Sequence, residues 1–231
     1  MGKGPYLAMT AAEIGETVDF PHPIGWMACH FSSGGTGLSN LPRELPAGSV
    51  LILDDSTPFH DHEPERILDQ LQKAMERYSA HALVLDLQRS GCSGVRDLVR
   101  LLSAVLPCPV AVTPEYAAED SAIFLPPVPA SASLSDWMRP WTGRALWLEL
   151  ALDAQRIRVT ADGAKTDYLP HFSQDGGLRD SDLCCHYQLE TTEDMAEFTL
   201  WRTREDVLDL AAQAQVLGVN CLGLFQELGE Y

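Results

Sequence analysis

The chain has 231 residues, of which 45% are hydrophobic and 21% are charged. These are ordinary values for a globular protein, and they exclude a largely disordered chain. Acidic residues outnumber basic ones by 33 to 16, so the net charge is −17. Such a chain does not present a broad basic surface, and we expect neither nucleic acid nor an anionic membrane as a partner.

The N-terminal segment lacks the apolar core of a secretory signal, and no apolar stretch of about 20 residues is present. The six cysteines are scattered and form no C-x-x-C motif. We therefore expect reduced thiols that pack as small hydrophobic side chains, and a cytoplasmic location.

The first two thirds of the chain alternate between predicted strands and helices. Apolar runs predict buried strands at 24–31, 49–55, 82–88, 109–112 and 122–125. Apolar residues at helical spacing predict one helix that begins near Pro64 and a second that ends before Pro107. This order is typical of a parallel sheet covered by helices.

The last third has a different pattern. After a strand at 145–151, alternating segments and the Asp162-Gly163 turn predict antiparallel hairpins over 157–160, 186–189 and 198–201. Thr203 is the predicted N-cap of a long helix, which a final strand at 220–225 follows. We expect a single domain over 1–231 with a β-rich insertion at about 150–200.

Ligands of parallel α/β folds bind at the carboxyl ends of the strands. An acidic and amide-rich rim with aromatic neighbours suits a neutral polyhydroxylated ligand, because these groups hydrogen-bond hydroxyls and stack on sugar rings. Individual carboxylates can instead cap helices or close loops. The predicted rim residues are Asp54, Asp55, Asp86, Gln88, Glu115, Tyr116, Glu149, Gln226 and Glu227, with Trp26, Trp147 and Phe225 nearby.

Two segments have the composition of metal ligands. His60-Asp61-His62 could bind an ion with Asp54 or Asp55, but side chains two residues apart in an extended loop diverge, and a helix entry before Pro64 is favoured. Cys184-Cys185-His186 is favoured as part of a strand core. Gly34-Gly35-Thr36-Gly37 opens no convincing helix, so it is a weak phosphate loop. We therefore expect no metal and no cofactor.

The segment that ends at Gln88 resembles glycoside hydrolase family 18, the chitinase-like barrels. In that family a helix leads into a strand reading D-G-x-D-x-D-x-E, and the matching residues here are His81-Ala82-Leu83-Val84-Leu85-Asp86-Leu87-Gln88. The C-terminus resembles the spore-cortex branch of the family more closely. Trp201, Glu205-Asp206, the helix to Leu217, Gly218 and Phe225 follow the order of that branch.

The departures from this pattern matter for chemistry. The resemblance implies a mechanism in which the acetamido oxygen of the sugar attacks, an Asp orients it and a Glu protonates the leaving oxygen. Asp86 falls on the orienting Asp, whereas Gln88 falls on the acid, and a carboxamide cannot act as a general acid. His81 and Val84 occupy the first two Asp positions. The resemblance thus implies a degenerate site.

We therefore predict an α/β fold, a TIM-type (β/α) barrel. The family motif lies on the fourth strand, but only two convincing strands precede residue 82. Either a strand lies within residues 1–23, or the barrel is short or incomplete. The leading functional hypothesis is a catalytically degenerate, glycosidase-like protein whose strand-end rim binds either an oligosaccharide of the N-acetylhexosamine type or no ligand at all. Two alternatives are an active hydrolase that uses other rim carboxylates, two of Asp54, Asp55, Glu115, Glu149 and Glu227, and a protein-interaction module.

Overall fold

The computed structural model describes residues 4–16, 23–33, 37–59, 64–92 and 94–229. Eight parallel strands form a closed barrel. The short strand β1 pairs with both β2 and β14 and closes it, so the barrel is complete and the predicted TIM-type architecture is confirmed. In order around the barrel the strands are β1 (Tyr6–Met9), β2 (Ile24–Phe31), β4 (Val50–Asp54), β5 (Ala82–Asp86), β6 (Val110–Val112), β7 (Ala122–Leu125), β8 (Leu146–Leu150) and β14 (Asn220–Leu224).

The strand β1 resolves the open question about the N-terminal segment. It lies within residues 1–23 and supplies the strand that the sequence pattern did not reveal. With β1 counted, β5 is the fourth strand of the barrel. Asp86 ends that strand and Gln88 follows it, so the segment that resembles the family motif lies on the strand where the family carries it.

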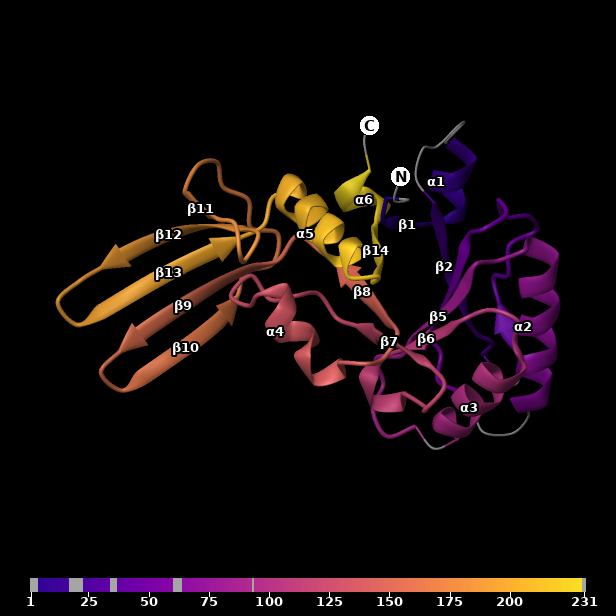
Figure 1. Cartoon of the computed structure of the whole chain (residues 1–231). Coiled ribbons are helices and arrows are strands. Elements are labelled where there is room, and N and C mark those ends of the chain that lie inside the picture. The colour runs from indigo at the N-terminus through magenta and orange to yellow at the C-terminus, as the bar shows by residue number, and fades with distance from the viewer. Residues whose placement is uncertain (1–3, 17–22, 34–36, 60–63, 93, 230–231) are drawn as a thin grey trace.

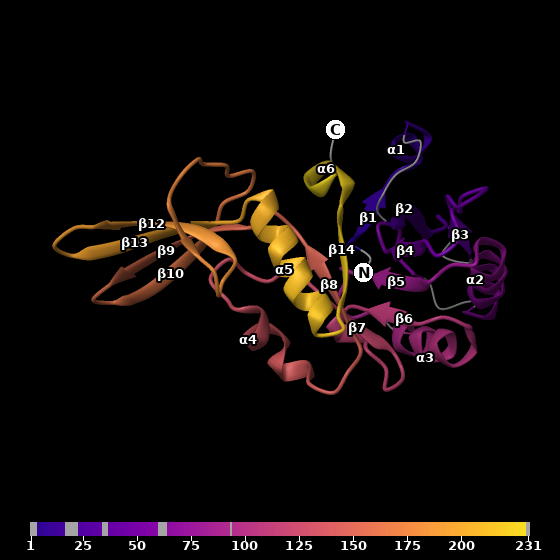
Figure 2. The ribbon, with the colours of Figure 1, turned by 45° about the horizontal axis from the view of Figure 1, so that its top comes forward.

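Helices connect the barrel strands (Figure 2). The described residues contain no helix with both the length and the hydrophobicity needed to cross a bilayer. The α-helices are α1 (Ala11–Glu16), α2 (Pro64–Tyr78), α3 (Val95–Val105), α4 (Leu134–Met138), α5 (Arg204–Val216) and α6 (Phe225–Leu228). The remaining small elements are the 3-10 turns η1 (Pro114–Tyr116) and η2 (Arg139–Trp141), and the two-residue strand β3 (Leu38–Ser39).

Alternate residues of each strand belong to different cores. On β5, Leu83 and Leu85 pack outward in a cluster with side chains of α2 and α3, whereas Ala82 and Val84 belong to the cluster that fills the barrel. This period of two is what a strand buried on both faces requires. It also decides which of the residues at a strand end point into the barrel.

Five antiparallel strands between β8 and α5 form a second sheet, in the order β10-β9-β13-β12-β11. This sheet projects to one side of the barrel (Figures 1 and 2). It lies within the region where the sequence predicts a β-rich insertion. Its strands are β9 (Ala154–Thr160), β10 (Gly163–Tyr168), β11 (Leu178–Asp180), β12 (Cys185–Thr191) and β13 (Met195–Trp201).

Two buried charged side chains fasten this sheet to the barrel. Arg202 donates to the carbonyls of Leu183 and Cys184 in the insertion, and to those of Val128 and Pro129 in the loop after β7. Asp206, at the start of α5, accepts hydrogen bonds from His186 Nδ1 and Arg179 Nε of the insertion, and it also closes the capping box with Thr203.

Replacement of Arg202 by Met keeps most of the apolar stem and removes every donor. Four backbone carbonyls lose a partner, and buried groups left without one cost about 1–3 kcal/mol each when water cannot reach them. We expect Arg202→Met to lower the free energy of unfolding by about 3 kcal/mol or more in urea titrations. The exposed Arg139→Met is the control, and a loss below about 1 kcal/mol in Arg202→Met would contradict this role.

Candidate functional site

Three carboxylates lie at the carboxyl-terminal mouth of the barrel. Asp54 and Asp86 end neighbouring strands and are directly opposite each other in the β4–β5 register. Glu149 lies on β8. Residues two positions apart on a strand point to the same side. The residues two positions before these carboxylates point into the barrel, so all three carboxylates point toward the barrel axis. These inward residues are Ile52, Val84 and Trp147.

A small cavity of about 60 Å³ lies between Asp86 and Glu149. This is room for a few water molecules, at roughly 10–15 Å³ for each, and it is far below the roughly 300 Å³ of a pocket for a whole small ligand. The cavity therefore suits one substituent of a larger molecule. Its other lining residues are Ala8, Met27, Ile52, Phe124, Leu150, Leu222, Gly223 and Leu224.

Gln88 is exposed at this mouth, and its carboxamide is oriented by Asp86. Gln88 Nε2 donates a hydrogen bond to Asp86 Oδ1 at 2.5 Å. In the part of the chain that the structure describes, no group donates a hydrogen bond to the amide oxygen of Gln88, which can accept one from a ligand. The pair thus offers a carboxylate and an amide to a ligand, and the amide has no acidic proton to give.

The backbone at Gln88 is held by Asp55, which is buried. Asp55 Oδ1 accepts from the backbone N–H of Gln88 at 3.0 Å, and Oδ2 accepts from that of Arg89 at 2.8 Å. Arg89 Nε returns a hydrogen bond to the Asp55 carbonyl at 2.8 Å. Asp55 therefore positions the loop that carries Gln88. The Asp55 side chain itself points away from the barrel axis.

Burial dominates the electrostatics of the two cavity carboxyls. Burial, together with the smaller effect of the nearby carboxylates of Asp86 and Glu227, raises the pKa of Glu149 from 4.5 to about 7. Burial also raises the pKa of Asp86, against the hydrogen bond from Gln88. A carboxyl with a pKa near 7 is partly protonated at neutral pH and can then donate a hydrogen bond.

Glu115 and Tyr116 lie elsewhere, on the turn η1 outside the barrel. Glu115 Oε1 accepts from the Gly91 N–H at 3.0 Å. The Tyr116 hydroxyl donates to the Arg89 carbonyl and accepts from the Cys92 N–H. Both side chains thus hold the loop after β5, beside a separate hollow of about 280 Å³. The structure does not bring them to the cavity of Asp86 and Glu149.

The aromatic residues of the predicted rim also lie away from the cavity. Phe225 is buried in the cluster between the barrel and α5. Trp26 points outward and donates from Nε1 to the Asn40 carbonyl at 3.0 Å. Trp147 fills the barrel interior, with its ring centroid 5.4 Å from that of Tyr6.

The predicted rim carboxylate Glu227 accepts a hydrogen bond from the Leu152 N–H at 3.1 Å.

The candidate metal ligands give no centre in the described part of the chain. No group of three or more His, Cys, Asp or Glu side chains there is arranged to hold an ion. His60-Asp61-His62 and Gly34 to Thr36 lie outside the described residues. Cys184 and Cys185 are buried at the start of β12, as the strand-core interpretation expects.

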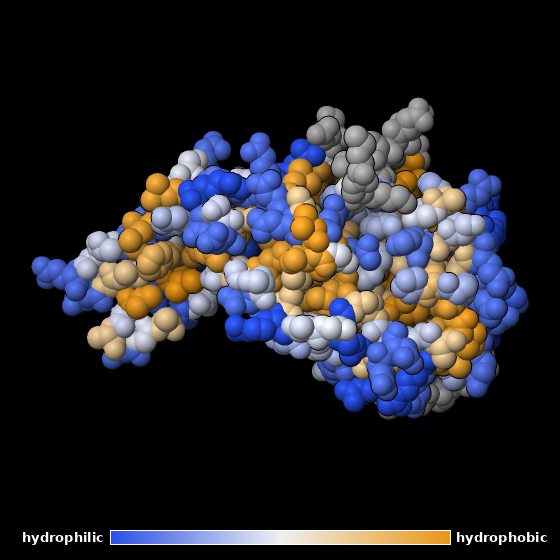
Figure 3. Space-filling model, in the orientation of Figure 1, coloured by the Kyte–Doolittle hydropathy of each residue, from blue (hydrophilic) through white to orange (hydrophobic). Residues whose placement is uncertain are grey.

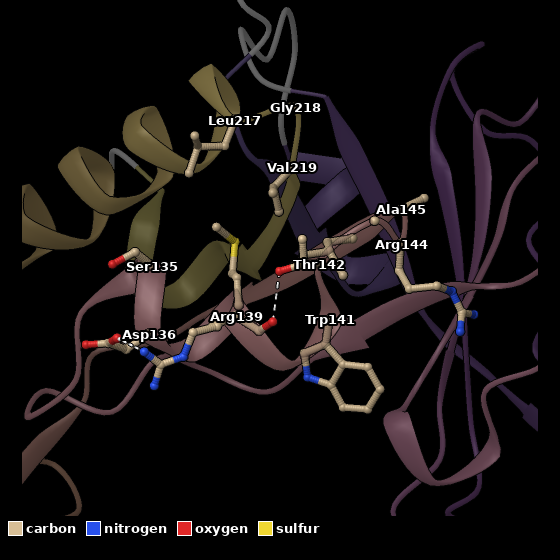
Figure 4. Close-up of a pocket in the computed structure, with 13 residues that line it drawn as sticks. Ser135, Asp136, Arg139, Trp141, Thr142, Arg144, Ala145, Leu217, Gly218 and Val219 are labelled. Atoms are coloured by element: carbon tan, nitrogen blue, oxygen red, sulfur yellow. Dashed lines mark hydrogen bonds and ion pairs between the residues drawn. The ribbon is translucent and has the colours of Figure 1, made fainter.

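A larger hollow of about 560 Å³ lies at the opposite, amino-terminal end of the barrel strands, between η2 and the starts of β8 and β14 (Figure 4). Its charged groups already have partners. Arg139 pairs with Asp136 at 3.2 Å, and Arg144 donates to the carbonyls of Ala118 and Ser121. Since active sites of such barrels lie at the carboxyl ends of the strands, the small mouth cavity is the better candidate site.

The sequence interpretation did not include the apolar cavity wall, of which Met27, Phe124 and Leu224 are examples. The alternation of inward and outward residues along a strand could have identified one of these residues, Phe124. Phe124 stands two positions after Ala122, and both belong to the cluster inside the barrel. Met27 gave no such signal, because β2 shifts register against β4 between Trp26 and Cys29.

Comparison with known proteins shows a likeness in structure only. No model of a known protein family matches the chain, and no curated protein matches significantly. Among solved structures, the spore cortex-lytic enzyme SleL of Bacillus cereus aligns with a TM-score of 0.52 and 8% identity, over 98% of this chain and 71% of SleL. SleL of Bacillus megaterium gives 0.53 and 7%, over 99% and 71%.

The chitinase-like agglutinin RobpsCRA of Robinia pseudoacacia aligns with a TM-score of 0.56 and 12% identity, over 96% of this chain and 94% of the agglutinin. At such identities the likeness shows the fold alone. The chain therefore has a glycoside-hydrolase-like TIM-barrel fold of the kind found in the cortex-lytic enzymes and the chitinase-like agglutinin.

The raised pKa of Glu149 predicts a pH-dependent stability. The unfolded carboxyl titrates near 4.5 and the folded one near 7. The folded state holds the proton more tightly, so stability falls as pH rises between these values and levels off above them. We expect Glu149→Gln to gain about 2.5 kcal/mol relative to wild type between about pH 5 and about pH 8.5, in denaturant titrations at both pH values.

The exposed Glu119→Gln is the matched control, since it makes the same chemical change away from the barrel mouth. An equal pH dependence of stability in wild type and in Glu149→Gln would show that the folded Glu149 titrates normally.

Proposed function

We propose that this protein binds a glycan that contains N-acetylhexosamine units at the carboxyl-terminal mouth of its barrel, without hydrolysing it. The observation that carries the proposal is the pair of Asp86 and Gln88 at the end of the fourth barrel strand. The Gln88 carboxamide lies beside Asp86 and hydrogen-bonds it, and the resemblance to the family motif implies a proton donor at this position in the hydrolytic enzymes.

The cavity supports this choice of ligand by its size and its lining. At about 60 Å³ it admits a substituent such as an acetamido group while the sugar ring stays outside. Met27 and Phe124 offer apolar contact to the methyl group. Asp86 can accept a hydrogen bond from the amide N–H, and protonated Glu149 can donate one to the carbonyl.

The chitinase-like agglutinin among the similar structures adds support, because the same fold there belongs to a protein named for agglutination. The acidic, amide-containing mouth is also consistent with an uncharged ligand that carries many hydroxyl groups. Location in the cytoplasm stays a prediction.

Binding can be tested with oligomers of N-acetylglucosamine by calorimetry, with glucose oligomers of equal length as the comparison. We expect binding of the acetylated oligomers only. Asp86→Ala removes the acceptor and frees the Gln88 side chain, so we expect it to weaken binding at least tenfold, or about 1.4 kcal/mol. The control Asp97→Ala changes an exposed aspartate on α3. Equal affinity for both oligomer types would contradict the acetamido site.

A second function, active hydrolysis, is favoured by one observation. Asp86 and Glu149 line the same cavity, and the pKa of Glu149 near 7 makes that carboxyl a possible proton donor at neutral pH. Most glycosidases use two carboxyl groups, one protonated as the general acid and one ionised as the nucleophile or base.

Release of reducing ends from the same oligomers separates the two functions. We expect no release by the wild type. Turnover that Glu149→Gln abolishes and Gln88→Ala leaves intact would establish the hydrolase instead. Turnover that Gln88→Ala abolishes would contradict the assignment of Gln88 as a binding group only.

A further inference from the structure

Apart from Asp180, which lies at the base of the sheet opposite the buried Cys185, one face of the inserted sheet carries no charged strand residue, although 21% of the chain is charged. Residues directly opposite in neighbouring strands lie on the same face, and the strand registers define three cross-strand rows there. We call these rows together the uncharged face. They are Tyr168-Gln155-Leu200-Tyr187-Leu178, then Thr166-Ile157-Phe198-Leu189, then Ala164-Val159-Ala196-Thr191.

The opposite face carries a network of ion pairs. Arg158 contacts Glu197 at 2.7 Å and Asp167 at 3.1 Å. Arg156 contacts Glu197 at 3.2 Å, and Lys165 contacts Asp167 at 2.8 Å. Such a face is stable in water. An antiparallel sheet with one solvated face ordinarily packs its other face against another layer.

The barrel covers only the base of the uncharged face. Leu200, in the first row, is buried with Ala130 of the loop after β7. Farther out, Val159 is 40% exposed and Leu189 48%, while Leu178 at one edge is 64% exposed. No layer from the described part of the chain covers these outer rows. Figure 3 shows hydrophobic side chains gathered over β9 and β13.

We propose that the uncharged face is the contact between two copies of this chain, paired sheet to sheet. The face is complementary to itself, because two copies meeting there about a two-fold axis bring no like charges into contact. A chain with a net charge of −17 repels a second copy overall, and an uncharged contact adds no further repulsion to that. Two apolar sheet faces pack about 10 Å apart with interdigitating side chains.

The size of the face sets the expected affinity. Thirteen residues, spaced about 4.8 Å between strands and about 7 Å between rows, cover roughly 440 Å², and the barrel already covers part of the first row. A standard interface buries about 800 Å² per partner, and smaller ones are weak. We therefore expect a reversible dimer with a dissociation constant on the order of micromolar or weaker.

The test is sedimentation of the full chain across about 1 µM to about 1 mM. We expect a monomer–dimer equilibrium in the wild type that salt does not weaken, because salt screens the repulsion between two acidic chains. The double variant Val159→Lys and Leu189→Lys places cations on the uncharged face at exposed positions. It also makes the net charge less negative, so a lost dimer could not result from stronger overall repulsion.

The matched control is Thr160→Lys with Gln188→Lys. These exposed neighbours lie on the same strands, make the same change in charge and point to the opposite face. We expect the control to dimerise like the wild type and the uncharged-face variant to stay monomeric, with its folding checked by circular dichroism. If the double variant does not fold, Leu178→Lys at the exposed sheet edge replaces it.

Four outcomes overturn the proposal. The first is a wild type that stays monomeric at every concentration. The second is equal dimerisation of the two variants. The third is that no dimer forms and the uncharged-face variant loses glycan binding. The uncharged face would then be a ligand-binding surface. A dimer that salt dissociates also contradicts it, because that behaviour belongs to an ion-paired contact.

Discussion

The candidate site depends on the buried carboxylate of Asp55, which accepts the backbone N–H groups of Gln88 and Arg89. These hydrogen bonds fix the direction in which the chain leaves the fourth barrel strand. Because side chains of an extended segment alternate, fixing the backbone at 88 keeps Gln88 on the side of Asp86, and the two hydrogen-bond each other. Tyr116 holds the same loop from the side of the next strand through the Arg89 carbonyl. The residues outside the barrel thus position the residues at its mouth.

The inserted sheet is likewise held in place by residues outside the candidate site. Arg202 and Asp206, four positions apart, are buried charged groups that bind groups from both the insertion and the barrel side of the chain. Because each buried charge has lost its hydration, it requires these partners, and removing one side of the arrangement leaves the other without compensation. This arrangement explains how a sheet whose outer rows lack a covering layer can keep a defined attachment to the barrel.

The sequence predicted the long elements well because their patterns are local. The strand at 24–31 and the helix from Pro64 both appear where the apolar spacing indicates. The four-residue β1 and the three-residue β11 are too short to show a period, and pairing with distant strands creates them. For the site, the rule of strand ends found Asp86 and Glu149. This rule does not say which face of the strand a residue lies on. Asp55 and Phe225 each follow an inward residue by one position, so they point away from the mouth although the rule had included them.

Whether such a mouth holds or cuts a glycan depends on which group carries the proton. Gln88 carries none that it can transfer, and Glu149 carries one at neutral pH only because burial disfavours its charged form. A ligand that displaces water from the cavity deepens this burial and favours the neutral carboxyl further. Protonation of Glu149 and occupation of the cavity then reinforce each other through linkage. In the complex that we propose, this proton is donated in a hydrogen bond to the acetamido carbonyl, whereas an acid catalyst would transfer it to the leaving oxygen.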